Sequence, residues 1–260
     1  MLGKSLAIIV ASPREKSGTT LLARLFADFF MLAGDAPLLF DTDTKKAKLS
    51  KYFPGRAELI DLENTKGQMS LFDRLPLRAH VPKIVDVSSR SFATVFSLMR
   101  DIEFIREARA NAVEPVIVYV PHYEADDFER GFRMREHFDC QFVVAENAFL
   151  GAAPASLHQL TAYWALKAHP VHLMLPVLDT MNMVLLEDER ISFGEFLRQT
   201  APKVPMPTPG QAAHMPLAYL SLEARSKIRS WLKPALHEVQ RTVNLIQQRI
   251  ETPPSEVAPF

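Results

Sequence analysis

The stretch from residue 11 to residue 20 joins an apolar run to an amphipathic one and carries residue types that bind phosphate. It reads ASPREKSGTT. A phosphate-binding loop of the form G-x-x-x-x-G-K-[ST] surrounds phosphates with backbone N–H groups, reaches the outer phosphates with its lysine and holds Mg²⁺ with its hydroxyl. The segment aligns with this loop without a gap, but Ser17 stands in the place of the second glycine and Gly18 in that of the lysine. By its own residues the motif is therefore incomplete.

Carboxylates and one amide follow three further apolar runs. Asp41 and Asp43 close the run that starts at position 38, and Asp86 lies between two valines. Asn147 follows a fourth run of apolar residues. Because ligands bind at the carboxyl ends of parallel strands, these side chains are candidates for one site with the 11–20 segment. Plainer interpretations remain open: aspartate and asparagine also form turns, although a charge inside an apolar strand needs a partner.

The elements that would position these residues alternate along the chain between short apolar runs and longer amphipathic ones. This pattern predicts an α/β fold, namely a doubly wound, mostly parallel sheet with helices on both faces. The expected strands are residues 6–11, 37–40, 58–62, 83–87, 115–120, 141–145 and 171–175. The expected helices are residues 19–33, 91–111, 126–138, 155–168 and 181–198, and Gly34 should end the first of them.

The C-terminal part follows a proline-rich segment. Residues 201–216 contain five prolines and are expected to form a linker between an α/β domain at 1–200 and a helical extension with a tail at 217–260. Two helices are expected there, at 217–231 and 234–250, with Pro234 in the first turn of the second. Their apolar stripe is expected to pack on the sheet, and a membrane contact through this basic amphipathic segment is the less favoured interpretation.

Composition limits the classes of function. Thirty Lys and Arg balance thirty Asp and Glu in 260 residues, which argues against binding nucleic acid through a global basic field. The basic cluster at residues 45–56 could contact DNA or another anion locally. The alternative interpretation is that it forms a solvated surface. The single Cys140 excludes an intrachain disulfide and fits a reducing compartment. No apolar run has the roughly 20 residues of a membrane span, so a cytoplasmic location is expected.

Taken in order, these motifs resemble the ParA/MinD group of P-loop proteins, within the class that includes CobQ and CobB. The shared features are a strand, a deviant phosphate loop, a helix, a strand of the type LLFDTD, a strand with a Walker-B-type aspartate in KIVDVSS, and a strand that ends in asparagine in FVVAEN. The resemblance covers about residues 5–200 and implies a P-loop-type fold.

The resemblance also implies a site for ATP or ADP with Mg²⁺. Thr19 would coordinate the metal directly, and Asp86 would hold it through water. Thr20 would lie against the α-phosphate, and Asn147 would touch the edge of the adenine. Asp41 and Asp43 would belong to the first switch region, where one of them would position the attacking water.

Both lysines of the family's loop are absent in the gapless alignment. The phosphate lysine falls on Gly18, and the lysine that crosses the dimer interface falls on Pro13. Arg14 and Lys16 lie nearby and could supply charge from another direction. A shifted alignment, with the 15–17 segment EKS acting as G-K-S, restores a lysine but places a carboxylate beside the phosphates and shortens the strand.

Loss of the loop lysine predicts feeble hydrolysis, slower by a factor on the order of 10²–10⁴. The expected function is that of a pseudo-ATPase that associates, with or without nucleotide, in the positioning, partition or mobilisation of a protein cargo. A homodimer is expected from the family. Two alternatives are an active ATP-dependent enzyme of the dethiobiotin-synthetase or CobB type that uses Lys16, and a scaffold that binds no nucleotide.

Overall fold

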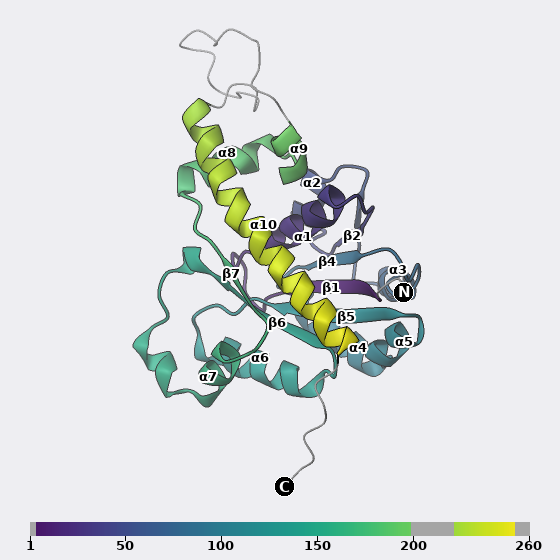
Figure 1. The fold of residues 1–260 in the computed structure, drawn as a ribbon. Coiled ribbons are helices and arrows are strands. Elements are labelled where there is room, and N and C mark those ends of the chain that lie inside the picture. The colour runs from purple at the N-terminus through teal and green to yellow at the C-terminus, as the bar shows by residue number, and fades with distance from the viewer. Residues whose placement is uncertain (1–3, 199–220, 253–260) are drawn as a thin grey trace.

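The computed structural model describes residues 4–198 and 221–252 and has a seven-stranded sheet at its centre (Figure 1). The strand order is β3-β2-β4-β1-β5-β6-β7, and every neighbouring pair is parallel. The bounds are β1 (Ser5–Ala11), β2 (Leu38–Asp41), β3 (Ala57–Leu59), β4 (Lys83–Val87), β5 (Val113–Tyr119), β6 (Gln141–Asn147) and β7 (His172–Leu175). All seven expected strands are present, and the doubly wound α/β fold is confirmed.

Ten α-helices are described around the sheet, with two short 3₁₀ turns at Ala148–Leu150 and Ala155–Gln159. The helices are α1 (Thr19–Leu32), α2 (Lys48–Tyr52), α3 (Thr65–Arg74), α4 (Phe92–Asp101), α5 (Phe104–Ala110), α6 (Ala125–His137), α7 (Thr161–Lys167), α8 (Thr180–Glu189), α9 (Phe193–Arg198) and α10 (Leu222–Glu251).

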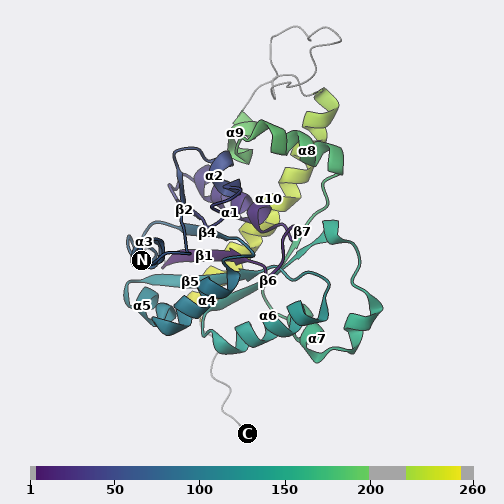
Figure 2. The same ribbon diagram turned by 180° about the vertical axis from the view of Figure 1, so that it is seen from behind.

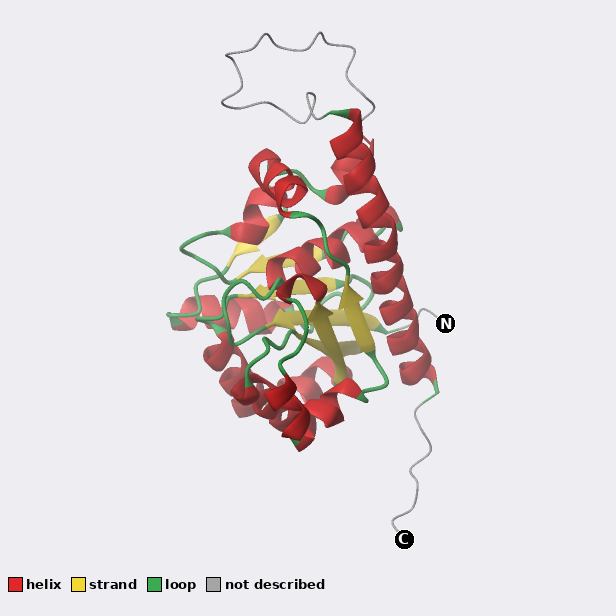
Figure 3. Ribbon diagram, turned by 90° about the vertical axis from the view of Figure 1, so that its left-hand side faces the viewer, coloured by secondary structure: helices red, strands yellow, loops and turns green. Residues whose placement is uncertain are grey.

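The sheet is covered on both faces because its central strands are apolar on both. In β1, Leu6, Ile8 and Val10 enter one core, which also takes side chains from α1, α2, α8, α9 and α10. The residues between them, among them Ala7 and Ile9, enter a second core with α3 to α7. Figures 2 and 3 show these two helical layers from behind and from the side.

The chain reverses direction across the sheet at β1. It runs from β1 outward to β2 and β3, returns to β4 and then builds β5 to β7 on the other side. In a doubly wound sheet, this reversal leaves a crevice at the carboxyl ends of the central strands, where ligands bind. Asp41 and Asp86 are register partners on β2 and β4 at that edge. The fold therefore brings the residues singled out in the sequence to one edge.

The C-terminal segment forms one helix where two were expected. The 30-residue α10 runs through Pro234 without a break and lies across the layer that contains α1 (Figure 1). Its apolar stripe is buried in the first core, as expected, from Ile228 to Ile246. Trp231 also donates its Nε1 to the carbonyl of Pro176 at 2.8 Å. This packing along the whole stripe keeps the helix continuous although Pro234 cannot donate a backbone hydrogen bond.

Three expected helices are interrupted. The segment 91–111 divides into α4 and α5 at Glu103, whose φ is 51°, and 181–198 divides into α8 and α9 at Arg190, whose φ is 49°. The segment 155–168 begins with a 3₁₀ turn before α7. The short α2 and the longer α3 were not expected. Gly34 ends α1 as expected, in a Schellman motif with a bond from the Asp35 N–H to the Phe30 carbonyl at 2.9 Å.

The expected linker at 201–216 and the first residues of the expected extension lie outside the described residues, as does the tail from 253. Within the described ranges, no helix has the length and apolar character to cross a membrane.

Candidate functional site

The loop between β1 and α1, residues 12–18, is closed by its own hydrogen bonds. The Ser12 hydroxyl donates to the Ser17 hydroxyl oxygen at 2.8 Å, and the Ser17 hydroxyl donates to the Arg14 carbonyl at 2.8 Å. Asn147, at the end of β6, donates its Nδ2 to the Ser17 carbonyl at 3.1 Å. Ser17 is buried. Its hydroxyl therefore holds the shape of the loop, and Asn147 ties that loop to the far strand.

Two residues of this loop have left-handed backbones. Gly18, which precedes the first turn of α1, has φ 98°, and Lys16 has φ 62°. A Cβ atom at Gly18 would lie 2.7 Å from Nδ2 of Asn147. Position 18 therefore requires glycine, so a lysine cannot occupy it on this backbone, although the gapless alignment with a phosphate loop assigns one there.

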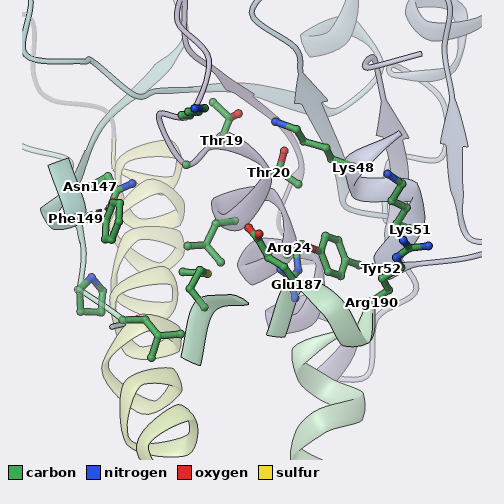
Figure 4. Close-up of a pocket in the computed structure, with 16 residues that line it drawn as sticks. Thr19, Thr20, Arg24, Lys48, Lys51, Tyr52, Asn147, Phe149, Glu187 and Arg190 are labelled. Atoms are coloured by element: carbon green, nitrogen blue, oxygen red, sulfur yellow. Dashed lines mark hydrogen bonds between the residues drawn. The ribbon is translucent and has the colours of Figure 1, made fainter. Parts of the chain in front are cut away.

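A cavity of about 440 Å³ lies beside the N-terminus of α1 (Figure 4). Gly18, Thr19 and Thr20 line it. The first N–H groups of a helix have no partner within the helix, and the helix dipole adds positive potential there. No side chain in the part of the chain that the structure describes caps α1, and its first turn has no acidic residue. The helix terminus therefore presents free donors to the cavity.

Cationic side chains outnumber carboxylates around the cavity. Lysines and arginines come from the loop, α1, α2 and the end of α8. Among the described residues, the only carboxylate in the lining is that of Glu187. The cations are Lys16, Arg24, Lys48, Lys51 and Arg190. Such a balance favours an anionic ligand.

The other side of the cavity is mainly apolar. Asn147 and Phe149 lie opposite Lys51, Tyr52 and Arg190 (Figure 4). Further apolar lining comes from the segment after β7 and from α8, with Pro176, Leu178 and Met183. Phe149 is 55% exposed, so its ring is available to a ligand. A ligand with one anionic end and one flat apolar end matches these surroundings.

The buried Asp86, near the end of β4, contacts the half-buried Thr20 in the first turn of α1. A hydrogen bond from Thr20 to the Asp86 carboxyl favours the charged acid, but burial is the larger effect and raises its pKa to about 7. The carboxyl groups of Asp41 and Asp43 raise this pKa further, and Lys48 opposes them. A buried carboxyl group beside a hydroxyl could bind a hydrated Mg²⁺ through water. The nearby cation would in turn keep the carboxyl group ionised.

Both carboxylate oxygens of Asp41 accept hydrogen bonds from neighbouring residues. Its Oδ1 accepts from the Asp43 N–H at 2.9 Å, and its Oδ2 accepts from the Ser50 N–H at 2.9 Å and the Ser50 hydroxyl at 3.1 Å. Burial raises the pKa of Asp41 above its usual range. The carboxyl group thus fixes the first turn of α2 and does not line the large cavity.

Asp43 does face a second, narrow cleft of about 20 Å³ on the other side of Thr20, which is room for a bound water or ion. The Arg90 guanidinium binds the Oδ1 of Asp43 at 2.8 Å, and the same oxygen accepts from the Lys46 N–H at 3.1 Å. Asp86 and Thr19 also line this cleft. Of the two expected switch aspartates, Asp43 is the one near the edge of the site.

Arg14 points away from the large cavity. Its Nε binds Oδ2 of Asp127 on α6 at 2.7 Å, and this hydrogen bond and charge raise the pKa of Arg14. It lines the narrow cleft only. Lys16 lines both spaces and, within the described ranges, takes part in no ion pair.

Arg24 is a fully buried arginine in the cavity wall. Its guanidinium lies 3.4 Å from the centroid of the Tyr52 ring and 4.2 Å from that of Phe193. Burial lowers its pKa to about 10. Its Nε has no hydrogen-bond partner among the described residues. A buried donor without an acceptor is costly, and an anionic ligand would relieve that cost.

The structure thus gathers most of the residues expected from the sequence. Gly18, Thr19, Thr20, Lys16 and Asn147 line the large cavity. The contributions of Tyr52 on α2, of α8 and of the segment after β7 were missed, since no motif marks them. The basic cluster at 45–56 was noticed in the sequence, but its residues have different surroundings. Lys46 pairs with Glu15 at 3.0 Å, whereas Lys48 faces the cavity.

Metal binding by side chains alone finds no support in the described ranges, where no group of three or more histidine, cysteine or acidic side chains could hold an ion. Mg²⁺ would therefore depend on phosphate oxygens and water in addition to Asp86 and Thr20. No protein-family model, curated protein or solved structure matches this chain, so any proposal for its function rests on its own fold and geometry.

Proposed function

We propose that this protein binds ATP or ADP with Mg²⁺ in the cavity beside α1 and hydrolyses ATP weakly or not at all. The observation that carries the proposal is the cavity itself. It combines an uncapped helix N-terminus, an excess of lysine and arginine, and an apolar wall with an amide at its edge. Phosphates fit the first end, and a base fits beside Phe149 and Asn147 at the other.

The geometry favours an alignment with a phosphate loop that is shifted by one residue from the gapless one. Thr20, not Thr19, contacts Asp86, as the metal-binding hydroxyl of such a loop would. Gly18 then keeps the place of the second glycine, with the positive φ that glycine favours. Thr19 stands in the place of the lysine. The phosphate lysine is absent in this alignment too.

Weak hydrolysis follows from the state of the carboxylates. Phosphoryl transfer to water needs a group that orients the nucleophile, together with charge around the phosphoryl group. Asp41 is saturated by bonds to Asp43 and Ser50, and Asp43 is paired with Arg90. Asp41 is therefore not free to position water, and Asp43 has only its Oδ2 left for that role. The missing loop lysine lowers the rate further.

We extend the proposal to a role as a ParA/MinD-like pseudo-ATPase that acts by association in positioning or mobilising a cargo. The support is the doubly wound sheet, the deviant loop at β1–α1 and the Asp86 strand beside it. Homodimerisation and the cargo remain predictions, as does any contact with DNA.

Calorimetric titration with ATP and with ADP in Mg²⁺, combined with a phosphate-release assay, tests the proposal. The expected result is nucleotide binding with little or no release of phosphate. Thr19→Lys, which restores the lysine where the backbone accepts a side chain, should bind ATP more tightly. Turnover by the wild type at a rate typical of ATP-dependent enzymes would refute the pseudo-ATPase. No heat with either nucleotide would leave the scaffold interpretation.

A further inference from the structure

The loop lacks the lysine that a phosphate loop places directly before its metal-binding hydroxyl, but the cavity also receives a cation from another element. Lys48 is the first residue of α2 and lines both the large cavity and the narrow cleft, together with Thr19 and Thr20. Its ammonium group extends from α2 toward these two threonines, away from Lys51 (Figure 4). It therefore reaches the space in front of the first turn of α1, where the outer phosphates of a nucleotide would lie.

Lys48 is held in this place by the residues that end β2. Asp41 binds both the N–H and the hydroxyl of Ser50, two residues after Lys48. The N–H of Ala47 donates to the Asp43 carbonyl at 2.6 Å, and Ala47 has a left-handed backbone with φ 45°. The turn that directs Lys48 into the site is thus fixed on both sides.

Three basic side chains near Lys48 are already paired. Lys46 binds Glu15, Arg90 binds Asp43 and Arg14 binds Asp127. The side chains of Lys48 and Lys16 form no hydrogen bond or ion pair with the residues that the structure describes. Of these two, Lys16 is exposed at the tip of the loop, whereas Lys48 is half-buried between α1 and α2. Lower solvent exposure makes a charge more effective toward a ligand.

We propose that Lys48 replaces the missing loop lysine and binds the outer phosphates of the nucleotide from the side of α2. This assignment rests on the proposed function. It gives the buried Asp41 a positioning role, since Asp41 holds the turn that carries Lys48. It also accounts for a site that keeps its glycine and its hydroxyl but has lost the lysine between them.

The test compares Lys48→Ala with Lys45→Ala, an exposed lysine of the same segment that lines neither space. MgATP and adenosine are titrated into each variant and into the wild type. Lys48→Ala should weaken MgATP binding roughly 10- to 100-fold, as expected for a charge-assisted phosphate contact. Its affinity for adenosine should be unchanged, because adenosine has no phosphate. Lys45→Ala should bind both as the wild type does.

The outcomes separate this assignment from the proposed function. If the wild type binds MgATP and Lys48→Ala binds it within twofold, the assignment is wrong and nucleotide binding stands. Equal losses for MgATP and adenosine would also overturn it, since they indicate a structural effect. If the wild type itself binds no MgATP, both proposals fail. Melting curves of the variants verify that each is folded.

Discussion

Asp86 is a buried, titratable residue that also belongs to the proposed binding site. Its carboxyl group is buried at the end of β4, and burial raises its pKa to about 7 from an ordinary 3.8. An acid kept neutral in the folded chain releases its proton when a cation approaches. The same group therefore links the stability of the protein to pH and, in the proposed site, to Mg²⁺.

Asp86→Asn should remove a pH dependence of stability. From about pH 4 to pH 7 the folded chain retains a proton that the unfolded chain has lost, so stability falls as pH rises through this window and is level above it. The neutral variant lacks this decline. Between pH 5 and pH 8, its free energy of unfolding should therefore rise by about 2 kcal/mol relative to that of the wild type. Urea denaturation at both pH values measures this difference.

Asp73→Asn, at an exposed position on α3, is the matched control and should show little pH-dependent difference. A difference between wild type and Asp86→Asn that stays constant over this pH range would contradict the raised pKa.

At the scale of elements, α1 holds the wall of the cavity in place. Asp28 on α1 accepts the N–H of Phe193 at 2.7 Å and that of Gly194 at 3.0 Å, both at the start of α9. Arg24, one turn earlier, stacks on Phe193. Since α8 and α9 are short and are separated by a left-handed break at Arg190, their position depends on these contacts.

Asp28→Ala should destabilise the protein by about 2–4 kcal/mol, because it leaves two buried N–H groups without acceptors. The loss should be local first, so hydrogen exchange at the start of α9 should accelerate more than exchange in β1. Asp35→Ala, an exposed acid just after α1, serves as control. Uniform acceleration over the whole chain would show that Asp28 does not act mainly on α9.

Pro234→Ala should stabilise α10. Proline inside a helix cannot donate to the carbonyl four residues earlier, that of Ser230, and alanine restores this bond. The expected gain is about 1–3 kcal/mol in the free energy of unfolding, measured with urea. Lys233→Ala, at the preceding exposed position, should change stability little. A loss on Pro234→Ala would mean that the helix is shaped around the proline ring.

The sequence allowed the strands to be predicted better than the helices. Strands such as β4 are short, apolar and bounded by polar residues, so their periodicity identifies them locally. The short α2 has no such signal, because the Asp41 carboxylate on another element fixes its first turn. The break at Glu103 is a single backbone conformation inside an amphipathic pattern, and Pro234 is a breaker that packing overrides.

At the scale of the whole molecule, α10 completes the core. Val239 is fully buried in the core that α10 shares with α1, whereas the next residue, Gln240, is exposed. Val239→Asp should cost more than about 4 kcal/mol or prevent folding, because it buries an unpaired charge. Gln240→Asp should be nearly neutral. Thermal unfolding of both variants compares them. If Val239→Asp were as stable as the wild type, the apolar stripe of α10 would not be packed in the core and would be available to a partner.

The site could be predicted from the sequence only where the chain order itself brings residues together. The β1–α1 junction and the strand ends at Asp41, Asp86 and Asn147 follow from a parallel sheet. The apolar wall around Met183 and the role of Lys48 depend on how separate segments fold back. The alignment of the loop was also beyond the sequence, because it depends on which threonine meets Asp86.

The structure of the protein crystallised with MgATP tests the central claim most directly. We expect the phosphates against the N–H groups of Gly18 to Thr20, with Lys48 at the outer phosphate, and the base beside Phe149. Nucleotide bound elsewhere on the molecule, or bound with its base at the α1 end, would contradict it.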